Sequence, residues 1–318
     1  MTDALDPTSW PLWSVFIRFA RRQLETLDYD PFHPMLVHLQ RGTSVDEGLW
    51  SSFLYMAFYN LGSAYCAWTT TRPMQALPAI ADRWSIGTQR RNLRASSVCK
   101  HVESLASQAR PHGSLYSFFT HDFTGNEKAD WLSLLNRLEG VWGNGRWGAY
   151  TTAELLQKVN QLPVQPATLG LEGATGPRKG LVVLTGLSAE TSTEVMQVYG
   201  DALLAKLRSL FPNPRIPWAR HGIDFAMTES ILCDFYGLTK GRYYIGRDID
   251  REAGRILSQS GRTDVDMGPL WAARATVFPP HLLAERRRTV LDIDYERARV
   301  YKETGLLADY RDDFPLLP

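Results

Sequence analysis

The sequence predicts a mainly α-helical fold. Apolar residues recur every three or four positions in several long segments, which is the spacing of a helix that buries one face. Runs that alternate apolar and polar residues, as strands do, are sparse. Glycine and proline interrupt the helical segments at intervals, so we expect a series of separate helices rather than one long bundle.

The length of 318 residues suits one large domain or two ordinary ones. We expect two helical lobes around a cleft, with an N-terminal lobe over residues 1–125 and a second lobe over residues 126–318. One integrated domain is the alternative. The net charge of +1 excludes a strongly basic protein that coats nucleic acid, but it permits DNA binding through few phosphate contacts.

The three cysteines lie far apart and form no CxxC pair. This pattern argues against a zinc site, an iron–sulfur cluster or a disulfide framework, and it favours a reducing compartment. We therefore expect no bound metal. The acidic N-terminus lacks the basic and apolar regions of a signal peptide.

Three long helical segments are expected in the first part of the chain, with a short helix over Met35 to Gln40 between the first two. Trp10 to Leu27 has one apolar face and predicts an amphipathic helix. Asp46 to Trp68 predicts one central hydrophobic helix, whose polar interruptions favour a buried core over a membrane span. Trp84 to Gln108 predicts a basic helix that is either a solvated face or a strip along DNA; its cations are Arg90, Arg91, Arg94 and Lys100.

The stretch from Leu138 to Lys158 carries the most informative pattern. Several glycines separate two helical runs, so a helix, a tight turn and a second helix are expected. The start of the second helix offers free backbone N–H groups, which suit an anion such as a phosphate. The residues assigned to this contact are Gly143, Gly145, Arg146 and Trp147. The alternative is a glycine-rich cap between two ordinary helices.

After this stretch, residues 162–180 predict a long loop that ends with Arg178 and Lys179. The apolar run over residues 181–187 is compatible with a strand or the start of a buried helix, and residues 191–210 predict a helix.

The segment from Phe225 to Tyr236 predicts a helix that ends at Gly237. Helical spacing places Glu229, Cys233 and Tyr236 on one face. Cations and tyrosines then follow, a mixture that suits either a pocket wall or a network of surface ion pairs. These residues are Lys240, Arg242, Tyr243, Tyr244 and Arg247.

The order of these pieces resembles the bacteriophage amino acid:DNA transferases, which are also described as α-glutamyl/putrescinyl thymine pyrophosphorylases. The turn at residues 140–148 is similar to the hairpin of the helix-hairpin-helix DNA glycosylase superfamily. The resemblance spans most of the chain and rests on the segments DPFHPML, SSFLYMAFYNLG, GVWGNGRWGAYTTAELL and TESILCDFYGLTKGRYYIGRDID.

The resemblance implies a helix-hairpin-helix fold and a DNA-modifying transferase. Such an enzyme replaces the phosphate of 5-phosphomethyl-deoxyuridine in double-stranded phage DNA with an amine, and glycine, serine and putrescine are all candidate donors. This thymidine hypermodification would protect phage DNA from host restriction. A separate hydroxymethyluracil DNA kinase would supply the phosphorylated base, and the enzyme would act in the cytoplasm of the infected bacterium.

That chemistry assigns roles to the candidate residues. Glu229 or Asp234 would take a proton from the amine, and Cys233 could add to the uracil ring as a thiolate. Lys240, Arg242 and Arg247 would stabilise the leaving phosphate, and Arg178 or Lys179 would pair with the carboxylate of an amino acid. The base must flip out of the duplex. The aromatic side chains available to stack on it, or to fill the gap, are Trp142, Trp147, Tyr243 and Tyr244.

The main alternatives are a helix-hairpin-helix glycosylase, a non-catalytic DNA-binding relative and an all-α structural protein. Glycosylases of the superfamily place an essential aspartate about twenty residues after the hairpin glycines. Here that region has none, and Gln165 stands nearest to the place. No nucleotide cofactor is expected, because the GxGxxG match at Gly143 follows a helical pattern rather than a strand.

Overall fold

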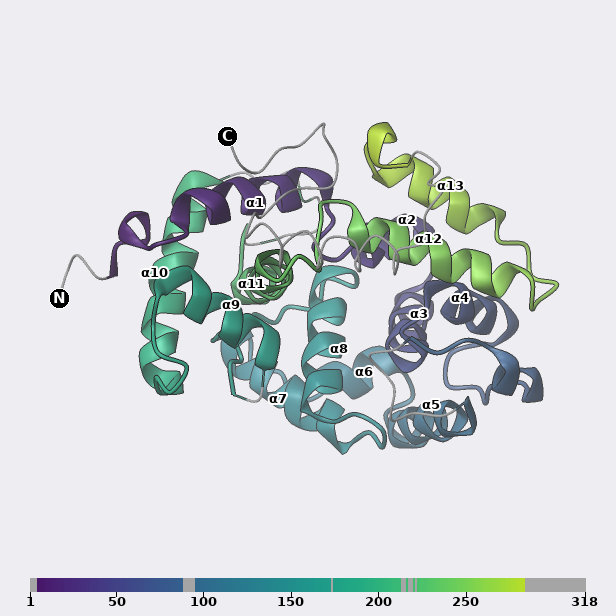
Figure 1. Ribbon diagram of the computed structural model, residues 1–318. Coiled ribbons are helices and arrows are strands. Elements are labelled where there is room, and N and C mark those ends of the chain that lie inside the picture. The colour runs from purple at the N-terminus through teal and green to yellow at the C-terminus, as the bar shows by residue number, and fades with distance from the viewer. Residues whose placement is uncertain are drawn as a thin grey trace. The chain divides into compact units, whose positions relative to one another are not determined.

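All the regular elements that the structure describes are helices. The computed structural model describes residues 5–87, 95–172, 174–212, 216, 220 and 222–283 (Figure 1). Within these residues α-helices and short 3-10 helices make up the secondary structure, which confirms the prediction of a mainly α fold. Three of the four cations of the expected basic strip, Arg90, Arg91 and Arg94, lie outside the described residues.

The chain forms two compact units. The first unit consists of Met1–Pro31, Pro166–Asp250 and Phe278–Pro318, and the second of Phe32–Gln165 and Arg251–Val277. Compact units defined by contacts differ from independently folding domains, so the division expected at residue 125 stays a prediction.

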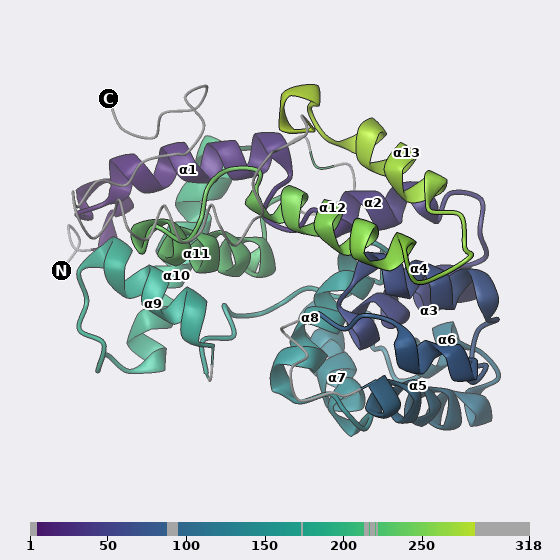
Figure 2. The ribbon, with the colours of Figure 1, turned by 45° about the vertical axis from the view of Figure 1, so that its right-hand side comes forward.

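The helices of the first unit are α1 (Trp13–Thr26), α9 (Thr175–Thr185), α10 (Thr193–Leu210) and α11 (Phe225–Thr239), with the 3-10 helices η2 (Pro7–Ser9) and η6 (Pro280–Leu282). Helix α11 contacts α1, α9 and α10, and Figure 2 shows α9 alongside it. The Phe235 ring lies 5.1 Å from that of Phe16 and 5.9 Å from that of Phe19. This aromatic cluster confirms the amphipathic helix expected near the N-terminus.

Helix α9 corrects one expectation and decides between two others. Residues 175–180 belong to a helix rather than a loop, and residues 181–185 continue this helix, so the helical alternative for this run is confirmed over the strand. The reason lies in close packing against α11. A Cβ atom on Gly176 would collide with the sulfur of Cys233, and one on Gly180 would collide with the carbonyl oxygen of Leu232. The two glycines therefore let the helix backbones approach closely.

The second unit contains α2 (Phe32–Leu39), α3 (Val45–Phe58), α4 (Leu61–Thr70), α5 (Ala95–Ala109), α6 (Leu115–Thr120), α7 (Glu127–Gly140), α8 (Arg146–Lys158) and α13 (Gly268–Val277), with η3 (Ala79–Arg83) and η5 (Arg110–His112). Helix α12 (Arg247–Ser260) begins in the first unit and continues in the second. Helix α3 contacts α4, α5, α6 and α8 and is buried along most of its length, so it forms the core of this unit.

The single helix expected over residues 46–68 is wrong, because the chain breaks at Tyr59. This residue adopts a left-handed conformation with φ of 47° and ends α3. Asn60 then caps α4, accepting a hydrogen bond of 3.1 Å from the amide of Ser63. Among the described residues, no helix combines the length and apolarity needed to cross a membrane.

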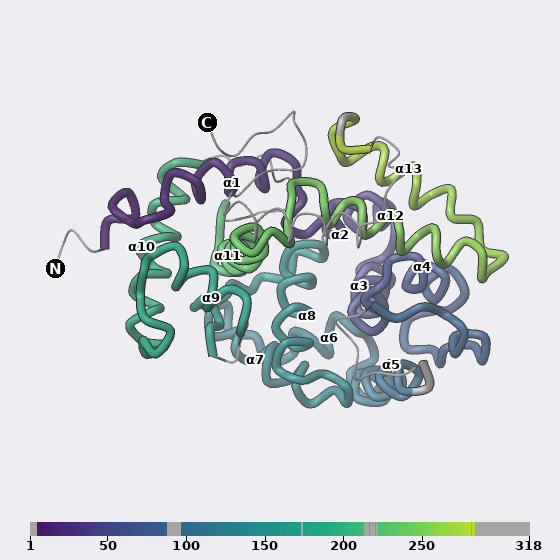
Figure 3. The backbone as a smooth tube through the Cα atoms, viewed as in Figure 1, coloured from purple at the N-terminus to yellow at the C-terminus, as the bar shows by residue number. Residues whose placement is uncertain are grey.

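The helix, turn and helix expected over residues 138–158 are confirmed. The chain reverses between α7 and α8, as Figure 3 shows, and the two helices pack on each other. Gly143 in the turn has φ of +92°, a conformation that side chains rarely adopt. The likeness of this turn to the hairpin of DNA glycosylases stays a prediction.

Candidate functional site

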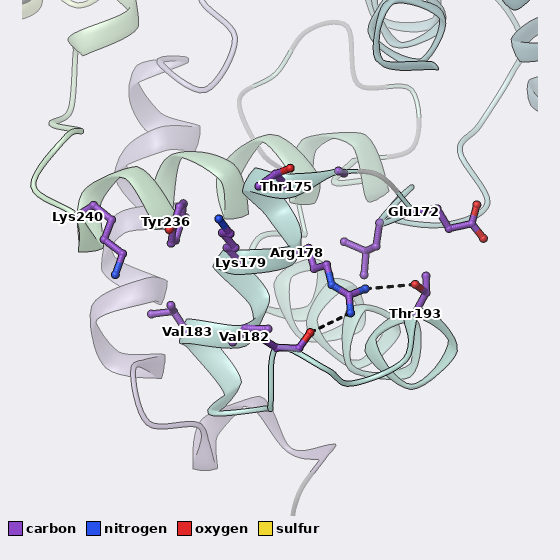
Figure 4. A pocket seen from close by; sticks show the side chains of 12 residues that line it. Glu172, Thr175, Arg178, Lys179, Val182, Val183, Thr193, Tyr236 and Lys240 are labelled. Atoms are coloured by element: carbon purple, nitrogen blue, oxygen red, sulfur yellow. Dashed lines mark hydrogen bonds between the residues drawn. The ribbon is translucent and has the colours of Figure 1, made fainter. Parts of the chain in front are cut away.

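The first unit contains a cavity of about 580 Å³. Its walls come from α9, from the segments that precede and follow it, from the first residue of α10 and from the end of α11 (Figure 4). Three of the predicted cations line it: Arg178, Lys179 and Lys240. A cavity of this volume is within the usual range for small-molecule sites.

Two of these cations share one aromatic ring. The Nζ atom of Lys179 lies 5.7 Å from the ring centroid of Tyr236, and that of Lys240 lies 5.6 Å from it. The sticks in Figure 4 show the two lysines and the tyrosine together at one end of the cavity. Cation–π attraction holds each ammonium near the ring. The two ammonium groups therefore concentrate positive charge at this end of the cavity, which suits a carboxylate or a phosphate.

Arg178 is engaged in holding a loop. Its Nη2 atom donates to the carbonyl oxygens of Thr191 at 2.6 Å and Ala189 at 3.2 Å, and its Nη1 atom donates to Oγ1 of Thr193 at 3.3 Å. These bonds tie the loop between α9 and α10 to α9, and Figure 4 marks two of them. Arg178 therefore fixes part of the cavity wall, while Lys179 and Lys240 supply positive charge to the cavity. Glu172 also lines the cavity and gives it a carboxylate.

The three predicted catalytic residues lie on α11. Burial among protein atoms, followed by the negative charges of Asp234 and Glu229, raises the pKa of the Cys233 thiol, although part of its side chain reaches solvent. The thiol therefore stays protonated at neutral pH, which disfavours a thiolate nucleophile in the free protein. Asp234 accepts a hydrogen bond of 3.3 Å from Nε2 of Gln23.

The remaining predicted cations lie elsewhere. Arg242 is exposed and is absent from the residues that line the cavity. Arg247 forms an ion pair of 3.0 Å with Asp248, and its guanidinium lies 6.0 Å from the ring centroid of Tyr243. The structure therefore brings Lys240 together with Lys179 and Arg178, and it does not bring Arg242 or Arg247 into the same cavity.

Tyr243 and Tyr244 are buried, so the expectation that they stack on a base is wrong. The hydroxyl of Tyr243 donates to Oδ2 of Asp28 at 2.6 Å, and the hydroxyl of Tyr244 donates to Asp250 at 3.0 Å. Polar groups that find such partners can enter a core. The charged residues around the two tyrosines in the sequence favoured a pocket wall or a surface network over a buried position.

Asp28 is a buried carboxylate that sequence reasoning missed. Besides Tyr243, it accepts hydrogen bonds from the backbone amides of Gly246 at 2.7 Å and Ile249 at 3.1 Å. It thereby fixes the chain where α12 begins. Burial, followed by the nearby Asp248 carboxylate, raises the pKa of Asp28 to about 7.

In the second unit, α5 braces the glycine turn from one face. Nδ1 of His101 donates to the carbonyl oxygen of Trp142 at 2.5 Å, while Oγ of Ser104 accepts from the amide of Trp142 at 2.9 Å. Gln108 donates to the carbonyl oxygen of Gly140 at 3.0 Å. A Cβ atom on Gly143 would collide with the His101 ring. The turn is therefore held in a fixed conformation by packing as well as by glycine.

Two tryptophans at the turn are exposed. Trp147 is 44% exposed and Trp142 is 40% exposed, and Nζ of Lys100 lies 4.2 Å from the ring centroid of Trp142. Helix α8 begins after Gly145, which is exposed and supplies no side-chain cap. The residues at the turn therefore include exposed aromatic rings, a cation and a helix N-terminus, which are the kinds of group that bind nucleic acid strands.

A family model described as amino acid:DNA transferase matches residues 24–243, well over half of the chain. The chain belongs to this family. An amino acid:DNA transferase acts as a transferase between an amino acid and DNA, so DNA modification is its class of activity. No curated protein matches the sequence significantly.

The matched residues include the turn between α7 and α8 and all the residues that line the cavity. The match stops before Arg247, so this arginine gains no support from the family. Among the described residues, no group of three or more His, Cys, Asp and Glu side chains is arranged to hold a metal ion. The candidate sites of this amino acid:DNA transferase are therefore a cationic cavity in one unit and a braced glycine turn in the other.

Proposed function

We propose that this protein replaces the phosphate of 5-phosphomethyl-deoxyuridine in DNA with the amino group of a free amino acid such as glycine. The family supports an amino acid and DNA as the two substrates. The observation that carries the proposal is the cavity in which Lys179 and Lys240 flank Tyr236. Two ammonium groups at one end of a small-molecule cavity suit the carboxylate of a free amino acid.

In this reaction the amine nitrogen forms a bond to the exocyclic methylene carbon at position 5 of the uracil. The bond between that carbon and the phosphate oxygen breaks, and the phosphate leaves with the electron pair. The amine must lose a proton, and Glu229 or Asp234 is the proposed base on α11. The raised pKa of the Cys233 thiol favours direct displacement over a route that begins with thiolate addition.

The other substrate is double-stranded DNA, which the turn between α7 and α8 would contact. Gly143, Gly145 and Arg146 would hold one phosphate at the start of α8, in the manner of a helix-hairpin-helix protein. Because the target carbon lies inside the duplex, the base has to flip out before it reacts. Arg242 and Arg247, which lie outside the cavity lining, stay candidates for contacts with DNA phosphates or with the leaving phosphate.

The proposed context is thymidine hypermodification in a bacteriophage, in the cytoplasm of the infected host. A DNA base that carries an amino acid is poorly recognised by nucleases that read the major groove, so it would resist host restriction. The phosphorylated base requires an earlier step, which a hydroxymethyluracil DNA kinase would supply.

The test is to incubate the protein with duplex DNA containing 5-phosphomethyluracil and with ¹⁵N-labelled glycine, and then to digest the DNA to nucleosides for mass spectrometry. The proposal predicts a nucleoside with glycine joined through nitrogen to the 5-methylene carbon, together with released phosphate. Abasic sites would indicate a glycosylase instead. Unchanged DNA with every amine of a panel of glycine, serine and putrescine would contradict the proposal.

A further inference from the structure

The second unit holds a group of aromatic and charged side chains that the cavity does not explain. Tyr59, at the end of α3, lies between two other side chains. The ring of Trp147, on α8, is 5.2 Å from the Tyr59 ring at an angle of 68°, and the guanidinium of Arg255, on α12, is 5.1 Å from the centroid of the same ring. Three elements far apart in the sequence therefore meet at one tyrosine.

Tyr59 is held in an unusual backbone conformation. Its φ of 47° lies in the left-handed region, which aromatic residues rarely adopt. The neighbouring backbone is fixed, because the amide of Gly87 donates to the carbonyl oxygen of Phe58 at 2.8 Å and Asn60 caps the next helix. Strain of this kind persists where the surrounding structure enforces it, and it often marks a functional position.

Arg255 is also fixed in place. It pairs with Glu252 one helical turn earlier, and the side chains of both residues are almost completely buried. A buried arginine that is paired on one side and placed over a ring on the other has little rotational freedom. Arg255 therefore fixes Tyr59 from one side, and the inner side is occupied by the Tyr55 ring, 5.4 Å away.

Trp147 is the exposed member of this group. It is the second residue of α8, directly after the glycine turn, and 44% of its surface is open to solvent. A large aromatic side chain that is exposed on one side and supported by a fixed ring on the other can stack on a nucleobase without first losing much conformational freedom. Its neighbour in the sequence is the cation Arg146.

We propose that Trp147 is a base-stacking residue for the DNA substrate, and that Tyr59 and Arg255 are positioning residues that hold its ring in the stacking orientation. The occupant is a DNA strand, because the family uses DNA and because aromatic rings next to cations match its bases and phosphates. The inference rests on the proposed DNA contact of the glycine turn, and it does not depend on the proposed reaction.

The test measures the affinity for a fluorescent duplex in which one mismatched thymine replaces the modified base, so that a base can leave the stack at low cost and the test is independent of the proposed reaction. Loss of one stacked base corresponds to about 1–3 kcal/mol, so Trp147→Ala is expected to weaken binding at least about fivefold. Trp147→Phe keeps an aromatic face and is expected to stay within about threefold of the wild type. Tyr116→Ala, which removes an aromatic side chain with 46% exposure from α6, is the matched control and is expected to change nothing.

The positioning role is tested with Tyr59→Phe and Tyr59→Leu. The phenylalanine variant keeps the ring and should bind DNA normally, whereas the leucine variant should weaken binding severalfold. With a reactive substrate, the leucine variant should raise KM for DNA and leave KM for the amino acid unchanged, a split that general destabilisation would not produce. Arg255→Lys keeps the charge and should lie between the wild type and Arg255→Gln.

Normal DNA affinity in Trp147→Ala would overturn the stacking role. Normal affinity in Tyr59→Leu, with the Trp147 effect present, would overturn the positioning role. If these variants lose affinity as expected but the wild type forms no aminated nucleoside, the stacking role stands and the proposed reaction fails.

Discussion

The turn between α7 and α8 and the cavity beside α9 and α11 are built in different ways. The turn joins residues that are consecutive in the chain, and its conformation follows from glycine spacing and the helical runs on either side. The cavity joins Lys179 to Tyr236 and Lys240, which come together only because two glycines let α9 approach α11. Local signals therefore describe the first site, and the second depends on tertiary packing.

The largest expected effect concerns the packing that forms the cavity. Gly180→Ala places a methyl group against the carbonyl oxygen of Leu232, so α9 has to move away from α11. We expect a loss of about 1–3 kcal/mol in the free energy of unfolding, as in other overpacked cores. Denaturant unfolding measures it. Gly254→Ala, in α12, has open space around the added atom and serves as the control, with unchanged or slightly raised stability.

The second prediction concerns pH. Because the pKa of Asp28 is raised from 3.8 to about 7 in the folded protein, the folded state binds more protons than the unfolded state between these values. The stabilising contribution of this group is therefore complete below about pH 4 and is lost as the pH rises through about 7. Urea unfolding between pH 4 and pH 8 measures this decline. Asp28→Asn removes the charge and should flatten the profile in this window, so an unaltered slope would contradict the prediction.

The third prediction compares two glycines of the turn. Gly143→Ala requires a left-handed alanine and collides with the His101 ring, whereas Gly145→Ala meets nothing within 4 Å. We expect the first variant to lower stability by about 1–3 kcal/mol and the second to lower it by less than about 1 kcal/mol. Thermal unfolding of the two variants checks the order. Equal losses would show that packing by α5 does not restrict the turn.

The smallest effect is expected for Cys233→Ala. The raised pKa keeps the thiol protonated at neutral pH, so loss of the sulfur should leave turnover within about threefold of the wild type. Alkylation by iodoacetamide at pH 7 should also be slow. A loss of a hundredfold or more in kcat would contradict this prediction and support addition of the Cys233 sulfur to the uracil ring.

Comparing the predicted and observed positions of individual residues shows which features of this protein its sequence predicts. The turn at Gly143 was predictable, because helical spacing and glycine position are local properties. Lys240 was identified from a cluster of cations, and its spacing of four from Tyr236 on α11 is a local signal for their contact. The contact of Lys179 with the Tyr236 ring was not predictable. Gly176, Pro177 and Gly180 are typical of a loop, and only the packing against α11 shows that they belong to a helix.

The burial of individual side chains was also not predictable from the sequence. Tyr243 lies among charged residues and was expected in a pocket wall or a network of surface ion pairs. It is buried instead, because Asp28, more than two hundred positions away, accepts a hydrogen bond from its hydroxyl. The break at Tyr59 was also missed. No glycine or proline stands at the break, and the left-handed residue is a tyrosine. The local signal is Asn60, which caps the helix that follows.

The measurement that tests the central claim most directly is the KM for glycine in the variant with both Lys179→Gln and Lys240→Gln. A lysine that pairs with the carboxylate contributes about 1.5–3 kcal/mol, so the loss of even one such pair predicts an increase of at least about tenfold in this KM. The KM for DNA should stay within about twofold of the wild type. Lys206→Gln, in α10 and outside the cavity lining, should match the wild type in both values. An unchanged KM for glycine, or an increase confined to DNA, would contradict the assignment of this cavity to the amino acid.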